Sequence, residues 1–244
     1  MELTGLVKRF RRIRALDGLD LSVPRGSIFG LVGSNGAGKT TAMAVTMGLL
    51  HTNAGTVSQL GDGPFNPARH IGRVSLLPQN AGFPRYARVE EVLRYYGRLQ
   101  GLSAEETRRS IDELLEQVNL KDRRRSPIRT LSHGMARRLA IAQAFLGSPE
   151  LVLLDEPLNG LDPPEAARAR DLIRGRRGRQ AIVISSHNLP DIQAVCDQVA
   201  FIEKGRRVRQ DTLEAIIHHR HQVRYLLQGA APLERLQAAE PEVQ

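Results

Sequence analysis

Eight consecutive residues, Gly33–Thr40, limit the possible folds more than any other part of this chain. They read Gly-Ser-Asn-Gly-Ala-Gly-Lys-Thr, after a short apolar segment, Ile28–Val32, and before a segment with helical spacing. The glycines let successive backbone N–H groups point inward and surround a polyphosphate. Lys39 adds a cation for the β- and γ-phosphates, and the Thr40 hydroxyl is a ligand for Mg²⁺. The strand–loop–helix context disfavours the alternative, a glycine-rich turn that binds nothing.

Apolar runs elsewhere predict further buried strands. Continuous apolar runs are typical of strands that are covered on both faces of a parallel sheet. After Lys39, the spacing of Met43, Met47 and Leu50 predicts a helix over 40–50. Strands that alternate with helices favour an α/β fold with a mostly parallel sheet. Besides Ile28–Val32, the predicted strands are Leu151–Leu154, Ile182–Ile184 and Val199–Ile202.

The pattern changes between about Gln79 and Pro149, where no run of residues predicts a strand. Residues 89–120 have helical spacing. A further amphipathic helix is predicted over about residues 131–146. We therefore expect a helical lobe inserted into the α/β core. The apolar positions that support these helices are Leu93, Tyr96 and Leu99, then Ile111, Leu114, Leu115 and Val118, then Leu131, Met135, Leu139, Ala142 and Leu146.

Composition indicates an ordinary globular protein of one to two domains, since 41% of the 244 residues are hydrophobic and 25% are charged. The single cysteine, Cys196, excludes an intramolecular disulfide and fits a reducing compartment. No apolar run approaches the roughly 18 residues that a membrane span needs. The first residues lack the apolar stretch of a signal peptide. We expect a soluble, intracellular chain.

The chain is basic, with a formal net charge of +9, and only four of its 35 basic residues are lysines. This balance fits a nucleic-acid partner, an anionic membrane surface or an acidic protein, or simply a codon composition that favours arginine. Aromatic residues make up 4% of the chain and do not alternate with the basic clusters. That pattern disfavours a stacking platform for single-stranded nucleic acid.

Two neighbouring carboxylates, Asp155 and Glu156, follow the predicted strand Leu151–Leu154. Carboxylates at the end of a buried strand are costly unless they are used. Asp155 is placed to hold magnesium through a coordinated water, and Glu156 to polarise an attacking water. Taken alone, the pair also fits an ordinary acidic turn, but the phosphate loop, Gly33–Thr40, favours the chemical role.

A third signal, Leu131-Ser132-His133-Gly134-Met135, stands roughly 20 residues before Asp155. Ser132 is a plausible N-cap, and the following helix would present its positive end to a phosphate. Together with Gln79, the segment Asn159–Asp162 and His187, these motifs occur in the order found in one family. From about residue 2 to residue 215, the chain resembles the ATP-binding subunit of an ATP-binding-cassette (ABC) transporter.

The resemblance implies a role for each matching residue. Phe10 corresponds to the aromatic that stacks on adenine, and Gln79 to the glutamine that touches the metal and lies at the hinge of the helical lobe. Ser132 and Gly134 correspond to signature residues that contact the γ-phosphate bound by the opposite subunit. Asp162 corresponds to an aspartate at the dimer interface. The implied catalytic residues are Glu156, His187 and Lys39; those binding nucleotide are Phe10, Gly33, Ser34, Asn35, Gly36, Ala37, Gly38, Lys39, Thr40, Thr41, Gln79, Leu131, Ser132, Gly134 and Asp162; those binding metal are Thr40, Gln79 and Asp155.

The resemblance also implies an architecture. The expected domain, residues 1–215, is a P-loop NTPase with a RecA-like core over 1–79 and 150–215. It has an N-terminal antiparallel β portion and a helical subdomain over about 80–149, and residues 216–244 form a tail of unassigned role. The implied cofactors are ATP and Mg²⁺. The implied partners are a separate transmembrane permease subunit and a second ABC subunit, in a head-to-tail homodimer or heterodimer. The chain would then lie in the cytoplasm, against the inner face of the membrane.

The signature departs from its commonest form, with His133 in place of glycine and Met135 in place of glutamine. This form resembles that of bacterial exporters of the ABC-2 type, so an exporter ATPase is the leading hypothesis. Leu158 also replaces a more usual serine or threonine. The alternatives are a soluble ABC-type ATPase acting on nucleic acid or ribosomes, and a nucleotide switch that does not hydrolyse. The chain has one cassette and no long coiled coil before the signature, so we expect no direct nucleic-acid partner.

Other residues have simpler interpretations. His218, His219 and His221 lack supporting cysteines or carboxylates, which favours a solvated helix end over a metal site. Cys196 is expected to be a small packing residue. The tyrosines Tyr86, Tyr95 and Tyr96 are either core residues or part of a docking surface for the membrane partner, which the resemblance places over Phe83–Tyr96.

Overall fold

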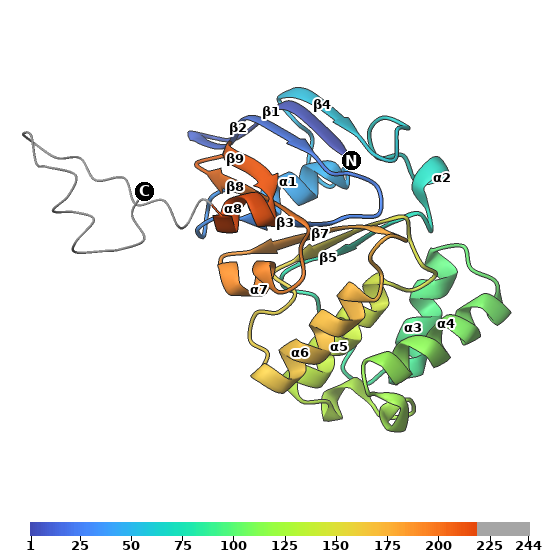
Figure 1. Cartoon of the computed structure of the whole chain (residues 1–244). Helices are drawn as coiled ribbons and strands as arrows, with labels where there is room; N and C mark the ends of the chain where they lie inside the picture. Colours follow the sequence, from blue (N-terminus) through green and yellow to red (C-terminus); the bar gives the residue numbers. More distant parts are fainter. Residues whose placement is uncertain (219–244) are drawn as a thin grey trace, which may run out of the picture. The chain divides into compact units, whose positions relative to one another are not determined.

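The computed structural model describes residues 1–218. Met1–Leu213 form one compact unit (Figure 1). A short helix, α8 (Leu213–His218), extends into the second unit and is described by itself. The side chain of His218, together with His219 and His221, lies outside what the structure describes. The interpretation of these histidines as a solvated helix end therefore stays a prediction.

The first sheet is antiparallel and has the strand order β2-β1-β4. Apolar residues alternate with exposed ones, so that Leu3 and Leu6 of one strand and Leu19 and Leu21 of the next are buried. Such alternation is typical of a sheet with one covered face. The expected N-terminal antiparallel portion is confirmed. Its strands are β1 (Glu2–Phe10), β2 (Ile13–Ser22) and β4 (Ala54–Ser58).

The second sheet has the order β5-β6-β7-β3-β8-β9, and every neighbouring pair is parallel except β8 with β9. All residues of β3, β6 and β7 are buried, as the continuous apolar runs predict. The parallel strands end at one edge, which we call the carboxyl edge. The strands are β5 (Val74–Leu77), β6 (Leu151–Asp155), β7 (Ala181–Ser186), β3 (Ile28–Val32), β8 (Gln198–Glu203) and β9 (Arg206–Thr212).

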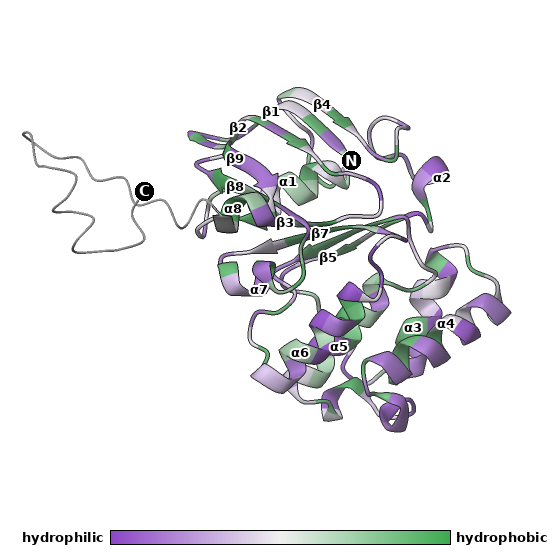
Figure 2. Ribbon diagram, in the orientation of Figure 1, coloured by the Kyte–Doolittle hydropathy of each residue, from purple (hydrophilic) through white to green (hydrophobic). Residues whose placement is uncertain are grey.

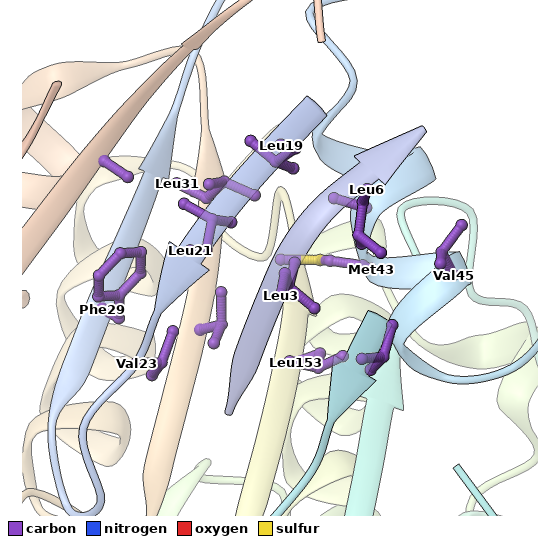
Figure 3. Packing of buried hydrophobic residues seen from close by; sticks show 14 of the residues in the cluster. Leu3, Leu6, Leu19, Leu21, Val23, Phe29, Leu31, Met43, Val45 and Leu153 are labelled. Carbon is purple, nitrogen blue, oxygen red and sulfur yellow. The ribbon is translucent and has the colours of Figure 1, made fainter. Parts of the chain in front are cut away.

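The core lies between the two sheets and encloses the helix α1 (Lys39–Thr46) (Figure 3). Met43 and Val45 of α1 pack with Phe29 of β3 and Leu6 of β1 in this cluster. Burying each such side chain contributes roughly 1.5–3 kcal/mol. This packing fixes α1 against β3, and so fixes the ends of the loop that joins them.

Between β5 and β6 the described chain forms helices, as the sequence predicts (Figure 1). Figure 2 shows hydrophilic residues along α3 and α4, in contrast to the largely apolar strands β5 and β7 of the second sheet. Within residues 1–218, no helix has both the length and the apolar character of a membrane span. The remaining helices are α2 (Pro67–His70), α3 (Val89–Leu99), α4 (Ala104–Gln117), α5 (His133–Ala144), α6 (Pro163–Arg174), α7 (Leu189–Gln193) and the 3₁₀ turns η1 (Lys121–Arg123) and η2 (Ile128–Thr130).

Two predicted helices are shorter than their apolar patterns, and in a third the last apolar position is exposed. The first, α1, ends at Thr46 rather than near residue 50, because Gly48 adopts a left-handed conformation with φ 66° that stops it. Leu99 is the last residue of α3 and is 50% exposed, so it does not belong to the buried face. Leu131 and Leu146 lie just outside the two ends of α5.

Cys196 is buried beside β3 and acts as a packing residue, as expected. A Cβ atom on Gly30 of β3 would come within 2.5 Å of Ile192 Cγ2 and 3.3 Å of Cys196 Sγ. Burial raises the pKa of the Cys196 thiol far above its ordinary value. The thiol is therefore protonated at neutral pH and is not a nucleophile.

Candidate functional site

The predicted site residues meet at the carboxyl edge because the strands before them are parallel neighbours. The phosphate loop follows β3, Asp155 ends β6, His187 follows β7 and Gln79 follows β5. In open α/β sheets, this edge is where ligands bind. Residues more than a hundred positions apart in the sequence are thus brought to one place.

Glycines in the phosphate loop are required for two different reasons. Gly36 and Gly38 have φ of 80° and 111°, which residues with a side chain rarely adopt. A Cβ on Gly33 would lie 2.4 Å from the Ile202 carbonyl oxygen, and one on Gly38 would lie 2.7 Å from that of Ala15. The loop is therefore packed closely on its outer side while its inner side stays open.

Lys39 begins α1, and its side chain is 6% exposed. Its ammonium donates to the carbonyl oxygens of Gly33, at 2.7 Å, and Ser34, at 3.2 Å. The Glu156 carboxylate is 3.4 Å away. Among the described residues, the carboxylate of Glu156, the predicted base, is thus the only charged group that forms an ion pair with Lys39.

A cavity of about 230 Å³ opens onto the phosphate loop. The phosphate loop contributes backbone N–H groups, the Thr40 hydroxyl and the Lys39 ammonium. Gln79, which follows β5, adds an amide, and Glu156, which follows β6, adds a carboxylate. Donors of this kind match a phosphate chain with a hard divalent cation such as Mg²⁺. The lining residues are Asn35, Gly36, Ala37, Gly38, Lys39, Thr40, Thr41, Gln79 and Glu156.

Asp155 is 1% exposed, and its Oδ1 accepts a hydrogen bond from the Ser185 hydroxyl of β7 at 2.5 Å. The same hydroxyl accepts from the Glu156 backbone N–H at 2.8 Å. Ser185 therefore orders both carboxylate residues. Sequence analysis did not identify it, although a serine inside a buried strand is itself a signal, because a buried hydroxyl needs partners.

Glu156 stands in an unusual backbone conformation, with φ 48°. Non-glycine residues pay about 1–3 kcal/mol for such a conformation, and it persists where surrounding contacts fix it. The carboxylate is 3.0 Å from His187 Nδ1 and 3.4 Å from Lys39 Nζ. Glu156 thus contacts each of the other two residues predicted to be catalytic, Lys39 and His187.

A second cavity, of about 350 Å³, lies on the other side of Glu156. It is lined by His187, by the loop residues Leu158–Leu161 and by residues of α6 and α7. The His187 side chain is 47% exposed, which leaves its second ring nitrogen accessible. His187 therefore connects the predicted base to an open surface.

Arg137 of α5 is a further residue that sequence analysis missed. Its side chain is buried, and its guanidinium donates to the carbonyl oxygens of three consecutive residues, Asp155, Glu156 and Pro157. Burial lowers its pKa, and the charges of Asp155 and Glu156 oppose that shift. In the sequence it reads as the polar side of an amphipathic helix, so its burial could not be seen.

Seven of the predicted nucleotide-binding residues do not line the cavity at the phosphate loop. Ser132 caps α5 by accepting from the Met135 N–H at 3.2 Å, and Asp162 caps α6 by accepting from the Glu165 N–H at 2.9 Å. Phe10 ends β1, is 41% exposed and lies under the Lys8 ammonium, 5.1 Å from its centroid. The seven residues are Gly33 and Ser34 of the phosphate loop and, elsewhere in the chain, Phe10, Leu131, Ser132, Gly134 and Asp162.

The tyrosines of the predicted docking segment are mostly on the surface. Tyr86 is 84% exposed and Tyr95 is 60% exposed, so the interpretation as core residues is wrong for both. Tyr96 is half-buried and makes edge contacts with Phe83 and Tyr95, at centroid distances of 6.1 and 5.6 Å. The aromatic residues thus form an exposed group rather than part of the core.

Comparison with known proteins places these motifs in one family. The family model described as "ABC transporter" matches residues 16–159. A Nod factor export ATP-binding protein I of Ralstonia nicotianae is 35% identical over 225 residues, which are 90% of this chain and 69% of the relative. A daunorubicin resistance ATP-binding protein of Streptomyces coeruleorubidus is 36% identical over 87% of this chain and 68% of the relative.

Solved structures agree with the sequence relatives. An ATP-binding subunit of an ABC transporter superimposes with a TM-score of 0.80 at 28% identity, over 98% of each chain. A dimeric ATP-binding cassette bound to ADP and Pi shares the fold, with a TM-score of 0.78 at 19% identity over 87% of this chain and 98% of that chain. With the family model matching more than half of its residues, the chain belongs to the ABC transporter family.

Proposed function

We propose that this chain is the ATP-hydrolysing subunit of an exporter and that it binds Mg-ATP at the carboxyl edge. The observation that carries the proposal is the contact of Glu156 with both His187, at 3.0 Å, and Lys39, at 3.4 Å, beside the phosphate loop. A carboxylate oriented between a histidine and the lysine of a phosphate loop is suited to water activation next to a phosphate.

The phosphate loop holds the phosphates through its N–H groups and through Lys39. Thr40, Gln79 and Asp155 are the residues proposed to hold Mg²⁺, with Thr40 and Gln79 at the cavity and Asp155 buried behind it. When bound, Mg²⁺ neutralises phosphate charge and orients the phosphate chain. The donor set of the cavity supports this assignment.

In the proposed reaction, Glu156 accepts a proton from the water whose oxygen attacks the γ-phosphorus. The bond from that phosphorus to the bridging oxygen breaks, and ADP and inorganic phosphate leave. His187 orients the Glu156 carboxylate and contacts the γ-phosphate, while Lys39 stabilises the charge that develops on it. The half-exposed position of His187 supports the second contact.

A complete site is proposed to need two subunits. Ser132, Gly134 and Asp162 lie away from the cavity, at the starts of α5 and α6. The start of α5 is a helix N-terminus, which favours an anion. We propose that it meets the nucleotide of a second ABC subunit in a head-to-tail dimer, and that Phe10 stacks on adenine.

The proposed partner in the membrane is a separate permease subunit, which places this chain on the cytoplasmic face. Two relatives are named for Nod factor export and for daunorubicin resistance, and these names support export over action on nucleic acid or ribosomes. The exposed aromatic group over Phe83–Tyr96 is the proposed docking surface.

The test is the Glu156→Gln variant of the full chain. Turnover of Mg-ATP is expected to fall by about a hundredfold or more, because a general base contributes at least that much. ATP binding is expected to persist, since the phosphate loop is unchanged. Light scattering with and without Mg-ATP then reports the mass.

A monomer that becomes a dimer with Mg-ATP supports a homodimeric site shared between subunits. A variant that stays monomeric while it binds ATP indicates a heterodimeric partner or closure that requires the permease, and co-purification then identifies the partner. Turnover equal to that of the wild type removes Glu156 from the role of base.

A further inference from the structure

Arg137 is a buried cation that the proposed roles leave without a function. It lies in the second turn of α5, five residues after Ser132. Its relative exposure is 8%, although arginine is seldom buried without strong partners. Its position between the helical insertion and the carboxyl edge suggests that the burial serves the site.

The guanidinium uses its donors on the backbone of two separate segments. Nε donates to the Pro157 carbonyl oxygen at 3.0 Å, and Nη2 donates to those of Asp155, at 3.1 Å, and Glu156, at 2.6 Å. Nη1 donates to the Gln79 carbonyl oxygen at 3.0 Å. One side chain thus joins the segment that carries the base to the segment that carries the proposed metal ligand Gln79.

These bonds restrain the unusual backbone of Glu156 from both sides. The N–H of Glu156 donates to Ser185, and its C=O accepts from Arg137. Both peptide groups that flank the left-handed φ of 48° are therefore fixed by buried side chains. A strained conformation persists when such contacts determine it, and here it aims the carboxylate at His187 and Lys39.

We propose that Arg137 is a positioning residue that holds Glu156 in the conformation needed for water activation and keeps the Gln79 segment in register with it. The proposal rests on the proposed role of Glu156 as the base. Arg137 does not line the phosphate cavity, so it acts through the backbone of Glu156 rather than on the nucleotide. It should therefore affect turnover and leave ATP affinity nearly unchanged.

The adjacent residue, Arg138, provides a matched control. It is also buried, at 3% exposure, and its guanidinium donates to the carbonyl oxygens of Val118 and Asn119 and pairs with Glu165. None of these partners belongs to the carboxyl edge. Substituting either arginine with methionine removes the same charge and the same donors from the same helix.

The experiment compares Arg137→Met, Arg138→Met and Glu156→Gln in the full chain, each shown to be folded by its thermal transition. Arg137→Met is expected to lower kcat about tenfold or more with KM and Mg-ATP affinity within about twofold of the wild type. Arg138→Met is expected to keep kcat within about twofold, whatever its loss in melting temperature.

Equal kcat in the two arginine variants, with Glu156→Gln inactive, overturns the proposal for Arg137 alone. Turnover retained in Glu156→Gln instead overturns the proposed base and is thus a distinct result. If Arg137→Met does not fold, the Arg137→Lys variant is measured in its place. One ammonium cannot serve carbonyls on both segments, so kcat is expected to fall about threefold or more at unchanged affinity, and a wild-type kcat overturns the proposal.

Discussion

Lys39 shows how one side chain can be both well packed and available for a ligand. Its ammonium sits over the carbonyl oxygens of Gly33 and Ser34, and it is close to Glu156 without a short ion pair, at 3.4 Å. Hydrogen bonds to neutral carbonyls are worth less than bonds to a charged phosphate. Exchanging the former for the latter is therefore favourable when phosphate is present.

Replacing Lys39 with alanine is expected to weaken Mg-ATP binding about ten- to hundredfold, as charge-assisted bonds contribute about 1.5–3 kcal/mol. A fluorescent ATP analogue measures the affinity directly. The melting temperature without nucleotide serves as the control and shows whether the variant is folded. Undiminished affinity would contradict the assignment of Lys39.

The residues that were predicted and those that were missed differ in how they reach the site. Lys39, Glu156 and His187 follow strands, and apolar runs in the sequence predict those strands. Ser185 and Arg137 contact the site through partners 29 and 19 positions away, Glu156 in both cases. Such contacts depend on the order of the strands in the sheet and on which side of α5 faces that sheet. The local sequence pattern determines neither of these.

At the scale of elements, the twelve-residue helix α5 carries residues of two proposed roles. Its first turn carries the signature residues, and its second turn carries Arg137. The amphipathic pattern predicted the helix correctly, but it predicted one apolar stripe. In the structure, Arg137 and Arg138 are buried along with Leu139–Ala142, because α5 is covered by the sheet on one side and by neighbouring helices on others.

Gly134 of α5 offers a test of the signature that does not disturb the fold. A Cβ atom there would meet Glu165 Cγ at 3.5 Å and Leu161 Cδ2 at 3.8 Å, both ordinary contacts. Alanine is favoured over glycine inside a helix by about 0.5–1 kcal/mol. Gly134→Ala is therefore expected to match or exceed the wild type in melting temperature.

The same variant is expected to lose about tenfold or more in ATP turnover, since the added methyl group separates the helix start from the phosphate of the second subunit. Calorimetry and a phosphate-release assay measure the two properties. Full activity in a stabilised variant would show that the start of α5 does not approach a nucleotide.

At the scale of the whole molecule, part of the positive charge within residues 1–218 is paired with carboxylates. Arg14 and Arg206 pair with Asp17, Arg73 with Asp62 and Glu150, and Arg124 with Glu90 and Asp112. Charges already paired in this way contribute little to a continuous basic surface. The α/β core and the helical insertion were predictable from continuous apolar runs and helical spacing, whereas the antiparallel sheet was expected only from the family resemblance. The ion pairs that connect distant segments were not predictable.

The helical insertion is attached unequally at its two junctions with the second sheet. At its return, the Pro149 carbonyl accepts from Gln180 at 2.5 Å, that of Glu150 accepts from the Ala181 N–H at 2.8 Å, and the Glu150 carboxylate pairs with Arg73. At its departure, the buried Arg137 holds the Gln79 carbonyl at 3.0 Å, but residues 80–86 beyond it lie exposed or half-buried. New chain ends, or an inserted sequence, are therefore expected to change the melting temperature little when they are placed after Asn80. New chain ends or an insertion after Ser148 are expected to unfold the protein. Thermal denaturation of two circular permutants would locate the permissive junction, where a split reporter of nucleotide state can be built.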